Sequence, residues 1–121
     1  MRVLIADESA AMRNLIKGGL SDLNVTDVSG AADGTEALRL FQEGGFDLIL
    51  SDWILAGLDG LEFLKAVRRQ NSAVPFLMVT TESERSRVIL AIQAGVSDYV
   101  VKPFTAETLK SKLDKWVSVQ S

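Results

Sequence analysis

Residues 2–8 read Arg2-Val3-Leu4-Ile5-Ala6-Asp7-Glu8, a run of aliphatic side chains that ends directly in two acids. A short, nearly continuous apolar run is typical of a strand covered on both faces, as in a parallel sheet. Phe46–Ser51 and Pro75–Thr80 repeat the pattern, and Asp98–Val101 is a shorter strand of the same kind. The more polar Val25–Ser29 fits an edge strand, where one side meets water. We therefore expect five strands.

Segments with the apolar spacing of a helix separate these strands. Asp33 and Asp59 each precede a glutamate by three residues, which predicts two capped helix starts, and Thr105 is the expected N-cap of the last helix. The adjacent glycines Gly18-Gly19 predict that the first helix frays or ends early. The expected inward-facing residues are Met12, Leu15, Ile16 and Leu20, then Phe63, Leu64 and Val67, then Val88, Ala91 and Ile92, and finally Leu109, Leu113 and Trp116.

Strict alternation of strands and helices implies an α/β fold, in which right-handed crossovers place helices on both faces of a parallel sheet. We expect this fold to form one domain over residues 1–121, because the chain contains no linker, repeat or low-complexity segment.

Composition excludes several kinds of chemistry. The 121 residues contain no cysteine and no histidine, so thiolate nucleophiles, Ser–His–Asp sites and His- or Cys-ligated metals are ruled out. The net charge is −3 and there is no Lys/Arg run, which argues against a nucleic-acid partner. The apolar runs are too short for a membrane span or a signal sequence, so we expect a cytoplasmic protein without membrane insertion.

Polar side chains follow four of the five expected strands. Asp7 and Glu8 come after the first strand, Asp52 after the third, Thr80 at the end of the fourth, and Lys102 after the fifth. Ligands of open α/β sheets bind at this carboxyl edge. Three clustered carboxylates repel one another unless a divalent cation neutralises them, and oxygen ligands suit Mg²⁺.

A lysine opposite such a metal attracts a doubly charged anion, for which a phosphoryl group is the obvious candidate. In a chain without Cys or His, a carboxylate must be the nucleophile, and Asp52 on a central strand is the best placed. Each of these residues alone is more often a turn former, a helix cap or a solvated loop residue. The five together at one edge are harder to ascribe to chance.

The ordered set formed by Asp7-Glu8, Asp52 with Gly60 eight positions later, Thr80 and Lys102-Pro103-Phe104 resembles the receiver domain of two-component response regulators. The resemblance covers essentially the whole chain. It is closest to the stand-alone chemotaxis regulators of that family, through Asp52-Trp53, Leu58–Glu62, Leu77–Thr80, Gln93–Gly95 and Tyr99–Ala106. It implies a flavodoxin-like doubly wound sheet with strand order 2-1-3-4-5, which is carried over from the family.

The resemblance also implies a mechanism. A histidine kinase would phosphorylate Asp52, with Mg²⁺ held by Glu8, Asp52, the backbone carbonyl of Ile54 and, through water, Asp7.

Thr80 and Lys102 would hold the phosphoryl oxygens, and Tyr99 would turn inward as Thr80 moves. Leu90, Tyr99 and Lys112 are the expected partner face, and a flagellar motor switch protein is the expected target. We expect a monomer.

The chain departs from the family pattern after the phosphoacceptor. Leu55-Ala56 stands where the family often has Met-Pro, which predicts a looser loop that leaves the metal-binding carbonyl intact. Ile54 stands where the chemotaxis relatives carry a polar residue. Together with Glu82, it would flank the water that hydrolyses the acyl phosphate, so we expect slow hydrolysis.

Other functions remain open at this point. A Mg²⁺-dependent phosphatase with an aspartate nucleophile needs the same residues, but also a cap for its substrate, for which few residues are left. A stand-alone receiver in a non-chemotaxis phosphorelay fits the same motifs. A flavodoxin-like nucleotide binder is disfavoured because no glycine-rich phosphate loop follows the first strand.

Overall fold

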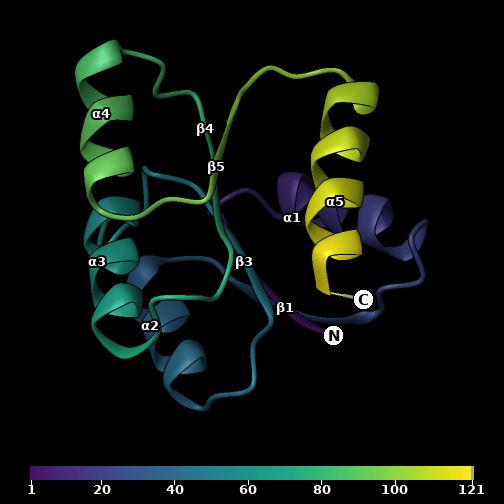
Figure 1. The fold of residues 1–121 in the computed structure, drawn as a ribbon, viewed down its shortest axis with the longest axis horizontal. Helices are drawn as coiled ribbons and strands as arrows, with labels where there is room; N and C mark the ends of the chain where they lie inside the picture. Colours follow the sequence, from purple (N-terminus) through teal and green to yellow (C-terminus); the bar gives the residue numbers. More distant parts are fainter. Residues whose placement is uncertain (121) are drawn as a thin grey trace.

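The computed structural model describes residues 1–120. Five strands and five helices alternate along the chain (Figure 1). The strands are β1 (Arg2–Ala6), β2 (Asp27–Ala31), β3 (Leu48–Ser51), β4 (Phe76–Thr80) and β5 (Asp98–Val101). The helices are α1 (Ala10–Ser21), α2 (Gly34–Gln42), α3 (Gly60–Gln70), α4 (Arg85–Gln93) and α5 (Ala106–Gln120).

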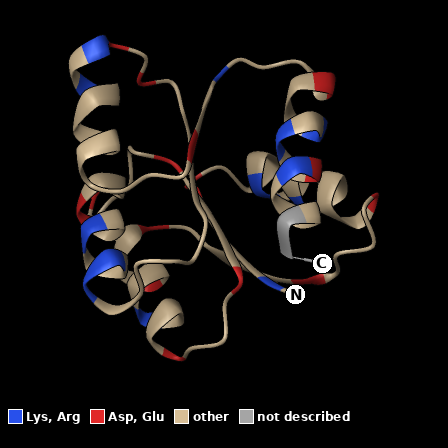
Figure 2. Ribbon diagram, in the orientation of Figure 1, with Lys and Arg blue, Asp and Glu red and all other residues tan. Residues whose placement is uncertain are grey.

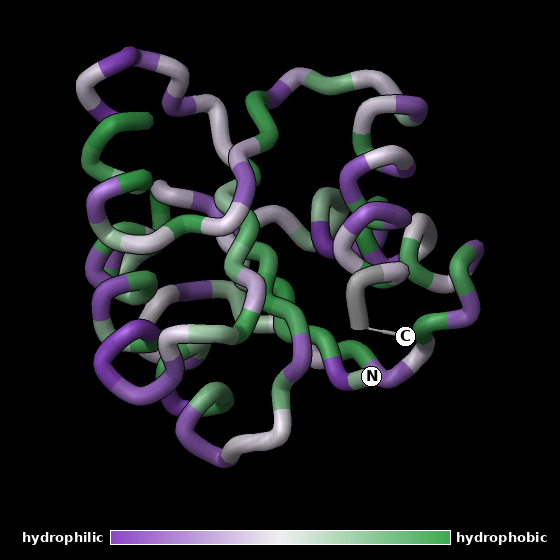
Figure 3. The backbone as a smooth tube through the Cα atoms, in the orientation of Figure 1, coloured by the Kyte–Doolittle hydropathy of each residue, from purple (hydrophilic) through white to green (hydrophobic). Residues whose placement is uncertain are grey.

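All strands are parallel and lie in the order β2-β1-β3-β4-β5, which confirms the expected doubly wound sheet. Helices α1 and α5 cover one face, and α2, α3 and α4 cover the other (Figure 1). Alternate residues of β1 feed two separate cores: Leu4 packs with α2 and α3, whereas Val3 and Ile5 pack with α1 and α5. Burial on both faces is why the central strands are apolar at nearly every position, as the hydropathy colouring shows (Figure 3).

The edge strand β2 begins two residues later than expected, at Asp27 instead of Val25. Val25 is buried, but its backbone N–H donates to the carbonyl of Leu20 at the end of α1, 2.9 Å away. Its burial therefore comes from the turn after α1, and pairing with β1 starts only at Asp27, opposite Arg2.

The expectation that α1 ends at Gly18-Gly19 was wrong, because the helix continues to Ser21. Gly19 lies against α5 so closely that a Cβ there would sit 2.8 Å from Cδ1 of Leu113. Tertiary packing of α1 on α5 thus outweighs the poor helix propensity of glycine. Gly18 has no such explanation, since a Cβ there would meet nothing within 4 Å.

The expected helix caps are confirmed. Asp33 and Asp59 accept hydrogen bonds from the backbone N–H groups of Glu36 and Glu62, each at 2.8 Å. Thr105 accepts from the N–H of Thr108 at 3.0 Å. The sequence analysis did not predict the N-cap of α1, which is Ser9.

Two of the residues expected to face inward are exposed. Leu15 is 51% exposed beside the groove between α1 and α5, and Ile92 is 62% exposed on α4. Helix α4 carries apolar residues on all sides and buries only Ala91, so its sequence pattern did not define an inner face. None of the helices among residues 1–120 has the length and apolar character needed to cross a membrane.

Candidate phosphorylation site at the carboxyl edge of the sheet

Three strands bring charged side chains to one point at the carboxyl edge of the sheet. Asp7 and Asp52 follow the neighbouring strands β1 and β3, and Lys102 follows β5. Its ammonium Nζ donates to Oδ2 of Asp7 at 2.7 Å and to Oδ2 of Asp52 at 3.0 Å. Figure 2 shows acidic segments close to the central strand ends. The sequence prediction that these residues converge therefore agrees with the geometry.

Lys102 is held as a cation. Burial acts to lower its pKa, but the hydrogen bonds and charges of Asp7 and Asp52 outweigh burial, and the pKa of Lys102 is raised overall. The side chains of Lys102, Asp7 and Asp52 are 13%, 5% and 13% exposed. In a site this enclosed a fixed ammonium acts strongly on any anion that enters.

The loop between β1 and α1 fixes Asp7 from several directions. Its Oδ1 accepts from the N–H of Ser9 at 2.9 Å, and Ser9 in turn caps α1 by accepting from the N–H of Met12 at 3.1 Å. The guanidinium of Arg13 donates to the backbone carbonyl of Asp7. Helix α1 and this carboxylate are thus positioned together.

The β3–α3 loop holds the other acids. Oδ1 of Asp52 accepts from the N–H of Ile54 at 3.2 Å, and the Ile54 side chain is 52% exposed. Oε1 of Glu8 accepts from the N–H of Ala56 at 3.0 Å. A proline at position 56 would have no N–H, so this contact depends on a residue other than proline at that position.

Glu8 is therefore hydrogen-bonded to the backbone of the β3–α3 loop. Within the described residues, no group of three or more acidic side chains is arranged to hold a metal ion. The chemistry of the site still suits Mg²⁺, because its carboxylates supply the oxygen ligands that this ion prefers. The two carboxylates of Asp7 and Asp52 also carry more charge than the single ammonium of Lys102 that lies between them. Coordination by Glu8 would require its carboxylate to leave the Ala56 amide.

Thr80 ends β4 next to this cluster. The side chain is fully buried, its Oγ1 accepts from the N–H of Glu82 at 3.3 Å, and its carbonyl accepts from the N–H of Lys102 at 2.8 Å. The hydroxyl of Tyr99 donates to the carbonyl of Glu82. Burial raises the pKa of Tyr99 to about 12, with smaller contributions from the charges of Glu82 and Asp52. Thr80 and Tyr99 are thus both hydrogen-bonded to the backbone of Glu82, in the loop that follows β4.

Asp98 was missed by the sequence reasoning. Its Oδ1 accepts from Nζ of Lys112 and from the N–H of Tyr99, both at 2.8 Å, and its Oδ2 accepts from Nε1 of Trp116 at 2.9 Å. Burial acts to raise the pKa of Asp98, but these hydrogen bonds lower it overall. The spacing of Lys112 and Trp116, one helical turn apart and opposite an acid on the last strand, was the available signal.

The residues expected to form a partner face are only partly free. Leu90 is 43% exposed, as expected, although Ile92 on the same helix is more exposed. Tyr99 is half-buried, and Lys112 is tied to Asp98. Val101 on β5 is 41% exposed. These residues lie on α4, β5 and α5.

The parallel sheet of order β2-β1-β3-β4-β5, with helices on both faces, defines a doubly wound α/β domain. The chain belongs to the response regulator receiver domain family, which matches residues 3–114. Proteins of this family are phosphoacceptor switches of two-component systems. Among curated proteins, the chain is similar to the chemotaxis protein CheY of Pseudomonas aeruginosa, with 46% identity over 95% of this chain and 94% of that protein. It is 44% identical to the chemotaxis protein CheY-3 of Vibrio cholerae, over 95% of this chain and 90% of that one.

Solved structures of other proteins have the same fold as this chain. The receiver domain of the Francisella response regulator 1452 superposes with a TM-score of 0.87 at 29% identity, over 99% of this chain and 98% of that one. The chemotaxis response regulator CheY4 of Vibrio cholerae superposes with a TM-score of 0.86 at 38% identity, over 95% of this chain and 97% of that one. The receiver domain of the sensor histidine kinase PA1611 from Pseudomonas aeruginosa, with a magnesium ion coordinated in its active-site cleft, gives 0.83 at 28% identity, over 97% of each chain.

Proposed function

We propose that Asp52 is the phosphoacceptor of this receiver and that a histidine kinase is its donor. The observation that carries the proposal is the Lys102 ammonium between Asp7 and Asp52, at 2.7 and 3.0 Å. A carboxylate oxygen of Asp52 attacks the phosphorus of a protonated phosphoimidazole, and the P–N bond breaks with its electron pair going to nitrogen. Neutral imidazole leaves and an acyl phosphate remains on Asp52.

The proposed Mg²⁺ ligands are Glu8, Asp52 and the backbone carbonyl of Ile54, with Asp7 acting through water. The bound metal supplies charge neutralisation for the incoming phosphoryl group. Asp7 is already held by Ser9 and Lys102, so its carboxylate needs no reorientation to contribute. Glu8 must give up the Ala56 N–H.

Phosphorylation would be read out through Thr80. Its hydroxyl and the Lys102 ammonium would bind phosphoryl oxygens, so that Thr80 leaves the Glu82 N–H that it now accepts from at 3.3 Å. Because Tyr99 donates to the carbonyl of Glu82, movement of this loop changes the support of the tyrosine ring. Tyr99 already packs against the core with its hydroxyl bonded to Glu82, so the inward turn expected from the sequence is replaced by a change in how this ring is held, which then alters the surface formed by α4, β5 and α5.

We infer that this surface binds the downstream target, with Leu90, Tyr99 and Lys112 joined by the exposed Ile92 and Val101. The similarity to chemotaxis proteins of Pseudomonas aeruginosa and Vibrio cholerae supports a role in chemotaxis, with a flagellar motor switch protein as the target. A receiver in another phosphorelay is the alternative.

Incubation with acetyl phosphate and Mg²⁺ tests the chemistry. We expect intact mass to rise by one phosphoryl group, with the group mapping to Asp52, and no gain in Asp52→Asn. Continued turnover of a phosphomonoester such as p-nitrophenyl phosphate, which is not an acyl phosphate, would instead indicate the phosphatase alternative. No mass gain, or a gain that persists in Asp52→Asn, would refute the assignment.

The pathway needs a separate test. Expression in a Pseudomonas aeruginosa strain that lacks its own chemotaxis protein CheY should restore directional switching, and Asp52→Asn should not restore it. A protein that is phosphorylated on Asp52 but fails to restore switching would support the non-chemotaxis alternative.

A further inference from the structure

The loop between β3 and α3, residues 52–59, lies on the first turn of α2. The N–H of Gly34, the first residue of α2, donates to the carbonyl of Ala56 at 3.0 Å. Helices α2 and α3 lie side by side on one face of the sheet (Figure 1). The loop that carries Asp52 is thus supported by a helix that contributes no residue to the proposed site.

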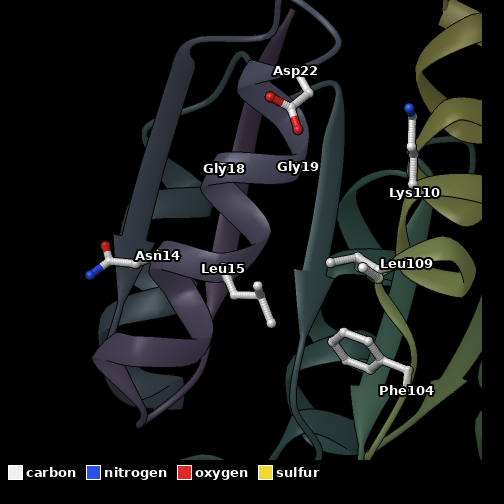
Figure 4. A pocket seen from close by; sticks show the side chains of 9 residues that line it. Asn14, Leu15, Gly18, Gly19, Asp22, Phe104, Leu109 and Lys110 are labelled. Atoms are coloured by element: carbon white, nitrogen blue, oxygen red, sulfur yellow. The ribbon is translucent and has the colours of Figure 1, made fainter.

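Gly34 allows the loop to approach α2 at backbone distance. A Cβ at this position would lie 2.6 Å from the carbonyl carbon of Leu58 and would overlap its oxygen. Not every glycine of the chain is needed for space, because a Cβ on Gly18, beside the pocket between α1 and α5 (Figure 4), would meet nothing within 4 Å. At Gly34, by contrast, a side chain requires either the loop or the helix to move.

The second residue of α2 also contacts the loop. Gly57 has a φ of +77°, the left-handed region that favours glycine, and a Cβ there would overlap Oγ1 of Thr35. Residues 56–58 therefore lie closely against residues 34 and 35.

The other end of the loop is held against α3. A Cβ on Gly60 would lie 2.7 Å from Cα of Trp53, and the Gly60 N–H donates to the carbonyl of Trp53 at 2.7 Å. Ile54 lies between these two anchored segments, and its side chain is 52% exposed, so it does little to hold the backbone in place. The Ile54 carbonyl is therefore positioned by the backbone contacts on either side of it.

We propose that Gly34 is a positioning residue of the Mg²⁺ site and acts through the loop backbone that lies on it. The inference rests on the proposed function, because it takes the Ile54 carbonyl as a ligand. Mg²⁺ requires nearly ideal octahedral geometry, so a displaced carbonyl binds it less well. Glu8 is an exposed, flexible side chain that can follow a displaced loop, whereas a backbone carbonyl cannot return to the ion independently.

Gly34→Ala tests the proposal, because its Cβ is accommodated only if the contact between the loop and α2 changes. We expect the Mg²⁺ dissociation constant, measured by calorimetry, to rise by about tenfold, as is typical when a group that orients a metal ligand is lost. The Mg²⁺ concentration for half-maximal phosphorylation by acetyl phosphate should rise by the same factor. The rate at saturating Mg²⁺ should stay near that of the wild type, since Asp52, Thr80 and Lys102 are unchanged. Partial unfolding would instead lower this rate without moving the midpoint.

Gly44→Ala is the matched control. Gly44 has a φ of +87°, so alanine there strains the backbone, but its Cβ would meet nothing within 4 Å. The residue lies between α2 and β3, at the amino edge of the sheet and away from the site. We expect Gly44→Ala to unfold at a lower urea concentration than the wild type and to bind Mg²⁺ with unchanged affinity.

The wild-type protein provides a second test that needs no substitution. If the contact between the loop and α2 strengthens Mg²⁺ binding, Mg²⁺ must stabilise that contact by the same factor. Hydrogen exchange of the Gly34 N–H, followed by NMR, should therefore slow by that factor at saturating Mg²⁺. The Asn71 N–H, which donates to the carbonyl of Val67 at the C-terminal end of α3, should exchange at an unchanged rate.

An unchanged Mg²⁺ dissociation constant in folded Gly34→Ala would overturn the proposal, as would an equal rise in Gly44→Ala. Exchange of the Gly34 N–H that is independent of Mg²⁺ would also overturn it. These results would refute only the role of Gly34, whereas a wild-type protein that does not bind Mg²⁺ would refute the proposed function as well.

Discussion

The hydrogen bond between Ala56 and Glu8 leads to a specific prediction for Ala56→Pro. Glu8 accepts from the Ala56 N–H at 3.0 Å, and this contact must break before Glu8 can bind Mg²⁺. Proline lacks the N–H, so the variant frees the Glu8 carboxylate in the metal-free protein. We expect Ala56→Pro to bind Mg²⁺ more tightly than the wild type.

The size of the effect follows from the one contact removed. A hydrogen bond to a charged group contributes more than a neutral one, but Glu8 is exposed to water, so we take about 1 kcal/mol. That free energy corresponds to about a fivefold change in the dissociation constant. The N–H of Ala56 donates to Glu8 and its carbonyl accepts from Gly34, so the substitution leaves the latter contact in place.

Mg²⁺ affinity is measured by calorimetry and by tryptophan fluorescence. Trp53 directly follows Asp52 and is only 3% exposed, so its emission reports on the site. Ala56→Gly is the matched control, because glycine keeps the N–H while making the loop more flexible.

The control separates two explanations. If loop rigidity governs affinity, glycine should weaken Mg²⁺ binding and proline should strengthen it. If the N–H governs affinity, glycine should leave it nearly unchanged. A folded Ala56→Pro protein with equal or weaker Mg²⁺ affinity would refute the reasoning.

Three further predictions concern the site and its supports. Ile54→Asn should shorten the lifetime of the acyl phosphate several-fold by admitting the hydrolytic water, as followed by phosphate release; an unchanged or longer lifetime contradicts the role of Ile54. Asp98→Asn should lower the free energy of unfolding by about 2 kcal/mol at neutral pH. Because folding lowers the pKa of Asp98 from 3.8, the difference from wild type should shrink as pH falls below that value; a difference independent of pH contradicts it. Lys102→Met should lower the free energy of unfolding by about 3 kcal/mol in urea titrations without Mg²⁺, since two buried carboxylates lose their cation. Folding raises the pKa of Lys102, so the wild-type advantage should be complete below pH 10.5 and decline above it, and an advantage that persists at higher pH would exclude this cause.

Much of the fold could be predicted because the sheet is covered on both faces. Continuous apolar runs locate β1, β3 and β4, and alternation with helices requires parallel strands. The start of β2 was misplaced because Val25 is buried by a turn, and burial alone does not distinguish a turn from a strand. The strand order came from family resemblance, since apolar patterns do not specify which strands are neighbours.

Helix α4 shows a different limit. Residues 88–92 are all apolar, so helical periodicity assigns no preferred face, and Ile92 was placed inward when it is 62% exposed. What decides its orientation is the fit of Ala91 against the other core residues, a tertiary property that a local pattern does not contain.

In the site, the positions of Asp7, Asp52 and Lys102 followed from topology, because strand ends meet at one edge. The hydrogen-bond partners of Glu8 and Asp98 could not be predicted from the topology. Each depends on one side-chain rotamer and on a donor 48 or 14 residues away. Hydrogen bonds of this kind are fixed only once the backbone is in place.

The two departures from the family pattern lie two residues apart, and they affect different steps. Ala56 restrains a metal ligand and should slow every step that uses Mg²⁺, whereas Ile54 should slow only hydrolysis. The double variant Ile54→Asn/Ala56→Pro should therefore be phosphorylated faster at limiting Mg²⁺ and also lose the phosphate faster. Ile54→Asn alone should change only the loss, and Ala56→Pro alone should speed formation. The rate at which the acyl phosphate forms with acetyl phosphate, and the rate at which it decays after acetyl phosphate is removed, test whether the two positions act on separate steps. Faster formation in Ile54→Asn alone would show that the two positions do not act separately.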